Sequence, residues 1–145
     1  MELTKDEKRD RVKLIEFYLK NYRTFKVANS NLQKQLELLM NVDQQNQPSM
    51  QFLDNEKLVA IRKKYNETLL IEKSIENAVH DLNPIEQQFI NSRYFKRHSI
   101  EKTAQTIGYS KASVYVLRSR IMDKLLISLG VIINTDLQSI VEEKK

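Results

Sequence analysis

The chain contains only two glycines in 145 residues, and one of them, Gly108, lies between two short amphipathic segments. Ser99 and Ser110 each precede one of these segments, and serine is a preferred residue at a helix N-terminus. A glycine that ends a helix adopts left-handed backbone geometry without steric cost. Residues 99–120 therefore predict two helices joined by a tight turn and crossing steeply, the arrangement of a helix-turn-helix.

The second of these helices is expected to have two different faces. Its inner stripe repeats at helical spacing, through Val114, Leu117, Ile121 and Leu125. The opposite arc carries small or neutral side chains, with Lys111 and Tyr115 on one side and Ser113 and Arg120 on the other; its members are Ala112, Val116 and Ser119. Such a face suits a helix pressed into the major groove of DNA. The alternative is an amphipathic helical hairpin with a solvated face.

If the segment binds DNA, its side chains divide into two groups. The predicted base-reading residues are Lys111, Ala112, Tyr115 and Val116. The predicted phosphate-binding residues are Arg93, Arg97, Ser99, Lys102, Ser110, Ser113 and Arg120. His98 is interpreted as a phosphate or backbone contact rather than a catalytic base.

From Leu82 to about Leu125 the chain resembles the sigma-factor domain that reads the upstream promoter element. That domain has the pattern Glu-x-Ala-x-x-x-Gly-x-Ser followed by a branched residue four positions on. The residues that carry the likeness are Glu101, Ala104, Gly108, Ser110 and Val114. The alanine falls three residues after the glutamate rather than the more usual two, which is a departure from the pattern.

As a whole the chain is similar to the ArpU/RinA class of small phage-encoded transcriptional regulators. The resemblance implies a sequence-specific DNA-binding regulator that activates phage late genes. It implies double-stranded DNA and RNA polymerase as partners, and the nucleoid in the cytoplasm of a bacterial host as the location.

Composition and charge agree with a helical DNA-binding protein. Two glycines and two prolines leave little material for the turns of a sheet, so an all-α fold is expected. Residues 82–130 hold 8 Lys/Arg against 3 Asp/Glu, net +5, whereas residues 1–81 hold 14 against 13, net +1, and the tail holds 2 against 3. The positive excess thus coincides with the predicted helix-turn-helix, as phosphate binding requires.

Several function classes are not expected. The chain lacks cysteine, which excludes disulfides and thiolate metal sites. No apolar run approaches the roughly 18 residues of a membrane helix, and the first ten residues are too polar for a signal peptide. His80 and His98 lie in different segments, and neither a phosphate-binding loop nor a dinucleotide fingerprint is present. We therefore expect no enzyme activity, catalytic residue, cofactor or metal site.

The N-terminal part is expected to be helical. Thr4 and Glu7 form a capping-box pattern before a helix that should run from about Lys5 into the low twenties. A second helix is expected near residues 27–40, with residues 29–31 either a break or part of one long bent helix. The aromatic residues of this part favour core or partner surface over a base-stacking platform; they are Phe17, Tyr18, Tyr22 and Phe25.

A linker is expected at residues 42–53, within the polar stretch that contains Pro48. A long helix over residues 54–81, capped by Asp54, then carries a nearly heptad seam. Its members are Leu58, Ile61, Tyr65, Thr68, Glu72, Ile75, Val79 and Leu82. Two interpretations stay open: the seam packs on the first two helices of its own chain, or it forms a homodimer.

Asn83 and Pro84 should end that helix and begin the one that supports the helical pair. Its apolar residues are Ile85, Phe89, Ile90, Tyr94 and Phe95. The helix that begins after Ser110 is expected to continue to a C-cap at Gly130. Beyond it, residues 131–133 are expected to be a strand or packed coil, with a short final helix after Thr135.

The expected fold is all-α: an N-terminal helical segment (1–41), a linker (42–53), a long connecting helix (54–81), a sigma-like helix-turn-helix domain (82–130) and a tail (131–145). Two other functions remain as alternatives. One is the small DNA-recognising subunit of a phage packaging terminase. The other is a helical adaptor that binds RNA polymerase or another protein through the surface from Phe17 to Phe25.

Overall fold

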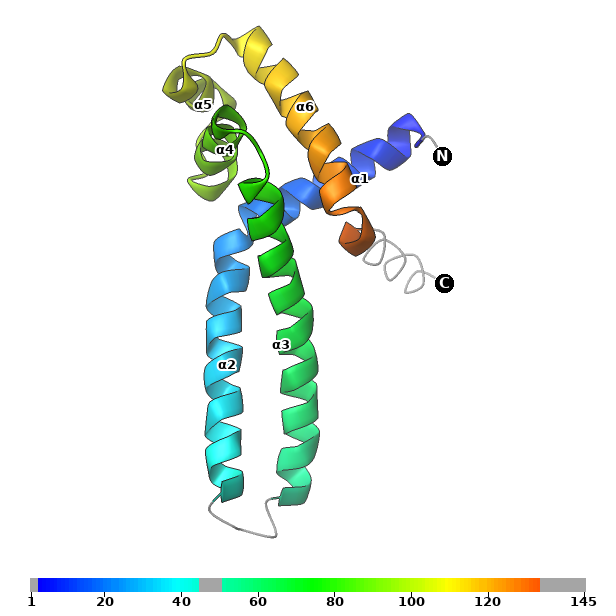
Figure 1. Ribbon diagram of the computed structural model, residues 1–145, viewed down its shortest axis with the longest axis vertical. Helices are drawn as coiled ribbons and strands as arrows, with labels where there is room; N and C mark the ends of the chain where they lie inside the picture. Colours follow the sequence, from blue (N-terminus) through cyan, green and yellow to red (C-terminus); the bar gives the residue numbers. More distant parts are fainter. Residues whose placement is uncertain (1–2, 45–50, 134–145) are drawn as a thin grey trace. The chain divides into compact units, whose positions relative to one another are not determined.

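The computed structural model describes residues 3–44 and 51–133, and these are helical throughout apart from short connections (Figure 1). The elements are α1 (Lys5–Lys20), α2 (Tyr22–Gln44), α3 (Gln51–His80), α4 (Pro84–Ile90), the π-helix η1 (Asn91–Phe95), α5 (Ile100–Ile107) and α6 (Lys111–Ser128). The expected all-α class is confirmed, and no strand occurs in the described part of the chain. None of the helices in these ranges has the length and apolarity to cross a membrane.

The chain forms two compact units. The described residues up to Tyr22 and from Ser74 onward make one unit, and Arg23–Lys73 make the other. This grouping differs from the expected division, in which residues 1–41 were one segment and 82–130 a separate domain. The first unit therefore brings together the two ends of the described chain, and the second is inserted between them.

The core of the first unit is built from α1, α4, η1, α5 and α6. Helix α1 packs against both α6 and η1, and in Figure 1 it crosses α6. The fully buried side chains include Ile15 and Leu19 of α1, Phe89 of α4 and Leu117 of α6. Burying a side chain of this size contributes about 1.5–3 kcal/mol, so α1 is a structural part of the unit.

The first helix ends earlier than the pattern suggested. The capping box of Thr4 and Glu7 is present, but the break lies at Asn21, whose side-chain amide donates to the carbonyl oxygen of Phe17 at 2.8 Å. Tyr22 begins α2 instead of extending α1. Residues 29–31, where either a break or a continuous helix was expected, lie inside α2, and Asn29 is buried.

The second unit is an antiparallel pair formed by α2 and most of α3, which run side by side in Figure 1. Asn29 donates through its amide to the carbonyl oxygen of Thr68 at 3.1 Å and to Oε1 of Glu72 at 3.0 Å. The hydroxyl of Thr68 also lies within hydrogen-bonding distance of Asn29 Oδ1. The two polar residues that interrupt the α3 seam are thus paired with a buried asparagine of α2, and this part of the seam faces α2 of the same chain.

Several expected boundaries are corrected. Helix α3 begins at Gln51 rather than at Asp54, and residues 42–44 of the expected linker belong to α2, whereas residues 45–50 lie outside the described residues. Leu129, not Gly130, caps α6. Residues 130–133 are helical rather than strand or coil, with Ile133 fully buried. The expected cap at Thr135 and the final helix lie outside the described residues.

Candidate nucleic-acid interface

Helix α4 supports the predicted helical pair and begins as the sequence indicates. The side chain of Asn83 accepts from the backbone amide of Glu86 at 3.0 Å, and the Glu86 carboxylate accepts from the backbone amide of Asn83 at 3.0 Å. Pro84 occupies the first turn. This reciprocal cap satisfies two amides that no helical carbonyl can reach.

The Glu86 carboxylate also ties α4 to α6. Its two oxygens accept from Lys124 Nζ at 2.7 and 2.9 Å, and Arg120 Nε lies 3.7 Å away. Burial raises the pKa of Glu86, but the hydrogen bonds from Lys124 and from the Asn83 backbone, with the charges of Lys124 and Arg120, bring it below the ordinary value. Glu86 and Lys124 are 38 positions apart in the chain, and the sequence gave no sign of this bond.

After α4 the chain continues as the π-helix η1 instead of ending, and it turns at Arg97. Arg97 has a positive φ of 58°, which few residues other than glycine adopt. Its guanidinium donates to the carbonyl oxygen of Lys20 at 2.9 Å, and the Arg93 guanidinium donates to that of His98 at 2.9 Å. Both predicted phosphate contacts therefore also stabilise this turn.

A turn at Gly108 joins α5 to α6, as predicted. Gly108 has a φ of 76°, and its amide donates to the carbonyl oxygen of Gln105 at 3.3 Å. The amide of Tyr109 donates to that of Ala104 at 2.8 Å, which completes a Schellman motif. The crossing of α5 and α6 is thus fixed by backbone geometry.

The serine hydroxyls cap the two helices of the pair. Ser99 accepts from the amide of Lys102 at 3.1 Å, and Ser110 accepts from that of Ser113 at 3.1 Å. The hydroxyls of Ser110 and Ser113 are also 2.8 Å apart. These hydroxyls already have partners within the chain, so the predicted phosphate contacts of the serines have to be made in addition to the caps.

The two faces of α6 lie as the sequence predicts. Val114, Leu117, Ile121 and Leu125 are 0 or 1% exposed. On the other face, Val116 is 69% and Tyr115 47% exposed, and Ala112 is also exposed. The first two turns of α6 therefore present the four predicted base-reading residues to solvent on one end of the helix.

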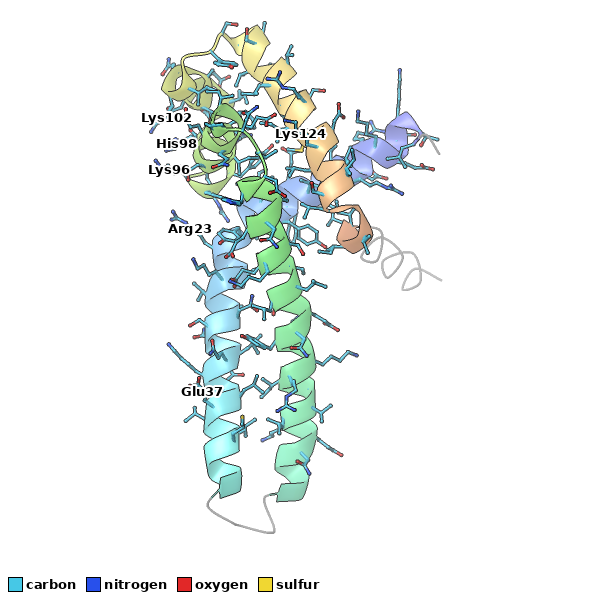
Figure 2. All side chains as sticks on the ribbon, in the orientation of Figure 1. Arg23, Glu37, Lys96, His98, Lys102 and Lys124 are labelled. Carbon is cyan, nitrogen blue, oxygen red and sulfur yellow. The ribbon has the colours of Figure 1, made fainter. Side chains whose placement is uncertain are left out.

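Lys96, His98 and Lys102 lie on the α4 and α5 side of the helical pair (Figure 2). Burial lowers the pKa of His98, and the positive charges of Lys102 and Lys96 lower it further. Its Nδ1 lies 3.1 Å from the Ser92 hydroxyl. Lys111 Nζ lies 3.6 Å from the Glu101 carboxylate, with both side chains exposed.

One cluster that positions α6 was missed. Glu16 of α1 accepts from the Tyr94 hydroxyl and from the Arg118 guanidinium, each at 2.8 Å. Burial raises the pKa of Tyr94 well above its ordinary value, and the charge of Glu16 raises it further. Glu16 and Arg118 are 102 positions apart in the chain, and no local pattern relates them.

The described residues contain no group of histidine, aspartate and glutamate side chains placed to hold a metal ion. Their arrangement suits contact with a polyanion: a rigid helix end with a small central face, flanked by cations. Comparison of the chain with protein-family models, curated proteins and solved structures finds no match.

Proposed function

We propose that this protein is a sequence-specific DNA-binding transcriptional regulator. The observation that carries the proposal is the division of α6, whose one face is fully buried while Ala112, Tyr115 and Val116 are exposed beside Lys111. A helix of this kind fits the major groove, since small central side chains let its backbone approach the base edges. The likeness to the sigma domain and to the ArpU/RinA regulators supports a role in activating phage late genes.

In the proposed mechanism, α6 enters the major groove by its N-terminal end. Lys111 and Tyr115 donate hydrogen bonds to base edges, and the methyl groups of Ala112 and Val116 contact thymine methyls. Lys102 and Lys96 bind phosphates and fix the register, while Arg120 lies on the flank. Arg93 and Arg97 hold the turn before α5 through their carbonyl contacts, and they can reach phosphates only with the guanidinium nitrogens that remain.

The test is selection of bound fragments from a random DNA pool, followed by affinity measurements on the selected and on a scrambled duplex. We expect Lys111→Ala and Tyr115→Ala to weaken binding to the selected site by about 1–3 kcal/mol and to relax sequence choice. Lys102→Ala is the matched control, because it removes a cation from the same motif without touching the base-reading face. This variant should weaken binding to both duplexes alike. It should also reduce the slope of log affinity against log salt concentration by about one.

Two outcomes would contradict the proposal. One is the absence of any enriched sequence in the selection at moderate salt. The other is an equal loss on selected and scrambled duplexes for Lys111→Ala, Tyr115→Ala and Lys102→Ala.

A further inference from the structure

The outward face of α3 carries two exposed apolar residues that the α2 and α3 pair leaves uncovered. Val59 is 67% and Leu70 58% exposed. They are eleven residues apart, which is three helical turns or about 16.5 Å, so both lie on one line along the helix. The seam of α3, with Ile61, Tyr65 and Thr68, lies on the opposite side.

We propose that this face of α3 binds the same face of a second copy of the chain, in an antiparallel pair with two-fold symmetry. Such an interface is self-complementary, so each contact occurs twice. Placing Leu70 of one copy opposite Val59 of the other satisfies both apolar residues in both copies. Beside Val59 the surface is hollowed between Asn55, Glu56 and Ala60, which provides space for the leucine.

The charges of the face fit this register. Between the two apolar positions, Lys63 and Glu67 lie on the same flank of α3. In the two-fold pair, Lys63 of one copy and Glu67 of the other lie at nearly the same height along the helix axis, with an offset of about 1.5 Å. Two ion pairs therefore form across the interface, and on the other flank Arg62 falls within about 1.5 Å of the level of the uncharged Asn66. No like charges face each other among these residues.

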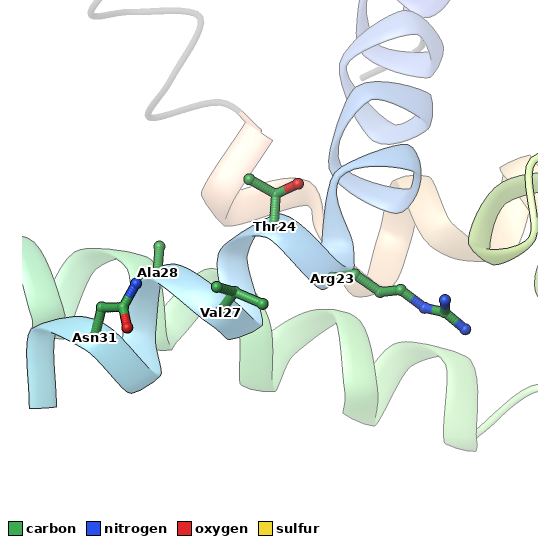
Figure 3. A pocket seen from close by; sticks show the side chains of 5 residues that line it. All are labelled: Arg23, Thr24, Val27, Ala28 and Asn31. Atoms are coloured by element: carbon green, nitrogen blue, oxygen red, sulfur yellow. The ribbon is translucent and has the colours of Figure 1, made fainter. Parts of the chain in front are cut away.

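The outward face of α2 provides a matched comparison, because its apolar residues have the same spacing. Val27 is 61% and Leu38 65% exposed, again eleven residues apart. Figure 3 shows Val27 with Thr24, Ala28 and Asn31 along this face, next to Arg23. The charged side chains nearest the centre of this face, Arg23 and Lys34, are both positive, and the acidic Glu37 lies at its edge. Two copies that met here would therefore form no ion pair close to the line of contact. Charge complementarity thus selects α3.

This inference does not depend on DNA binding, because self-association is measured on the full-length protein without DNA. Light scattering or sedimentation should give twice the 17.2 kDa chain mass. Val59→Glu and Leu70→Glu should each raise the dissociation constant of the dimer at least about tenfold. The controls Val27→Glu and Leu38→Glu should leave it unchanged. All four residues are exposed, so the fold, checked by circular dichroism, should survive.

The charge pair gives a second, independent measurement. Lys63→Glu and Glu67→Lys should each weaken the dimer, and the double variant should restore it, because each exchanged charge again faces its opposite. A monomeric wild-type protein, a dimer weakened equally by the α2 controls, or a double variant no better than the single ones would overturn the inference. So would a ring of many copies, the form expected of a small terminase subunit.

The register itself can be tested by cross-linking, since the chain contains no native cysteine. In the proposed pair, Cys introduced by Val59→Cys on one copy lies next to that of Leu70→Cys on another. A bismaleimide shorter than about 16 Å should link a mixture of the two single variants and should link neither variant alone. Linking of each variant to itself would instead indicate a parallel pair.

Discussion

The contact between Glu16 and α6 allows a quantitative prediction about what holds the first unit together. Glu16→Ala removes the acceptor of two hydrogen bonds at once, from the Tyr94 hydroxyl and from the Arg118 guanidinium. Hydrogen bonds to charged groups contribute about 1.5–3 kcal/mol each. Tyr94 is fully buried, so its hydroxyl loses its acceptor inside the protein when the carboxylate is removed.

The free-energy contribution of the bond between Arg118 and Glu16 is reduced by solvent, because the two side chains are 32% and 20% exposed. Water replaces part of this interaction, so its lower limit applies. We therefore expect Glu16→Ala to lower the free energy of unfolding by about 3 kcal/mol, a large part of the 5–15 kcal/mol that is typical of a domain. Asp123→Ala is the control, since Asp123 joins the same two helices by an exposed ion pair with Lys8 at 2.9 Å. Asp123→Ala should lower the free energy of unfolding by less than about 0.5 kcal/mol.

The assay is urea unfolding combined with hydrogen exchange of the α6 amides, which reports on this unit separately from the α2 and α3 pair. A double-mutant cycle of Glu16→Ala with Arg118→Ala should give a coupling energy of about 1 kcal/mol or more. Equal costs for Glu16→Ala and Asp123→Ala, or a coupling energy near zero, would refute the reasoning that α1 positions α6.

Two further predictions concern stability. The lowered pKa of Glu86 contributes stability that is present above the unfolded value of 4.5 and is lost as the pH falls through the folded pKa. Glu86→Gln should therefore destabilise the protein at pH 7, and its urea midpoint should change less than that of the wild type on acidification from pH 5. Gly108→Ala should cost about 1 kcal/mol through its left-handed backbone, whereas Gly130→Ala, in a helical segment, should stabilise by up to about 1 kcal/mol. An added Cβ meets no atom within 4 Å at either glycine, so equal thermal shifts for the two variants would contradict the backbone argument.

The features that sequence reasoning located correctly are those fixed by neighbouring residues. The caps at Asn83, Ser99 and Ser110 and the turn at Gly108 each depend on residues within a few positions. The buried stripe of α6 follows from the period of the helix alone. These local signals were enough to predict the helical pair and the exposed face that we propose reads DNA.

The features that were missed depend on residues far apart in the chain. Nothing near Glu16 indicates that its partner is Arg118, and nothing near Asn29 indicates Thr68. The seam of α3 had the period of a dimer interface, and periodicity cannot say whether the partner helix belongs to the same chain or to another. The π-helix η1 was also missed, because its sequence continues the apolar period of α4 without a breaking residue.

The proposed DNA contact and the proposed self-association involve different units. The chain leaves the unit that contains α6 after Tyr22 and re-enters it at Ser74. There the Tyr22 hydroxyl donates to Glu76 at 2.6 Å, and its ring stacks on Phe95 at 5.0 Å. Because the entry and exit are fixed to each other within the unit that contains α6, substitutions at Val59 or Leu70 should alter self-association and leave the affinity of one α6 for its half-site unchanged. A change in the half-site affinity of the monomeric variant would show instead that the two units are coupled.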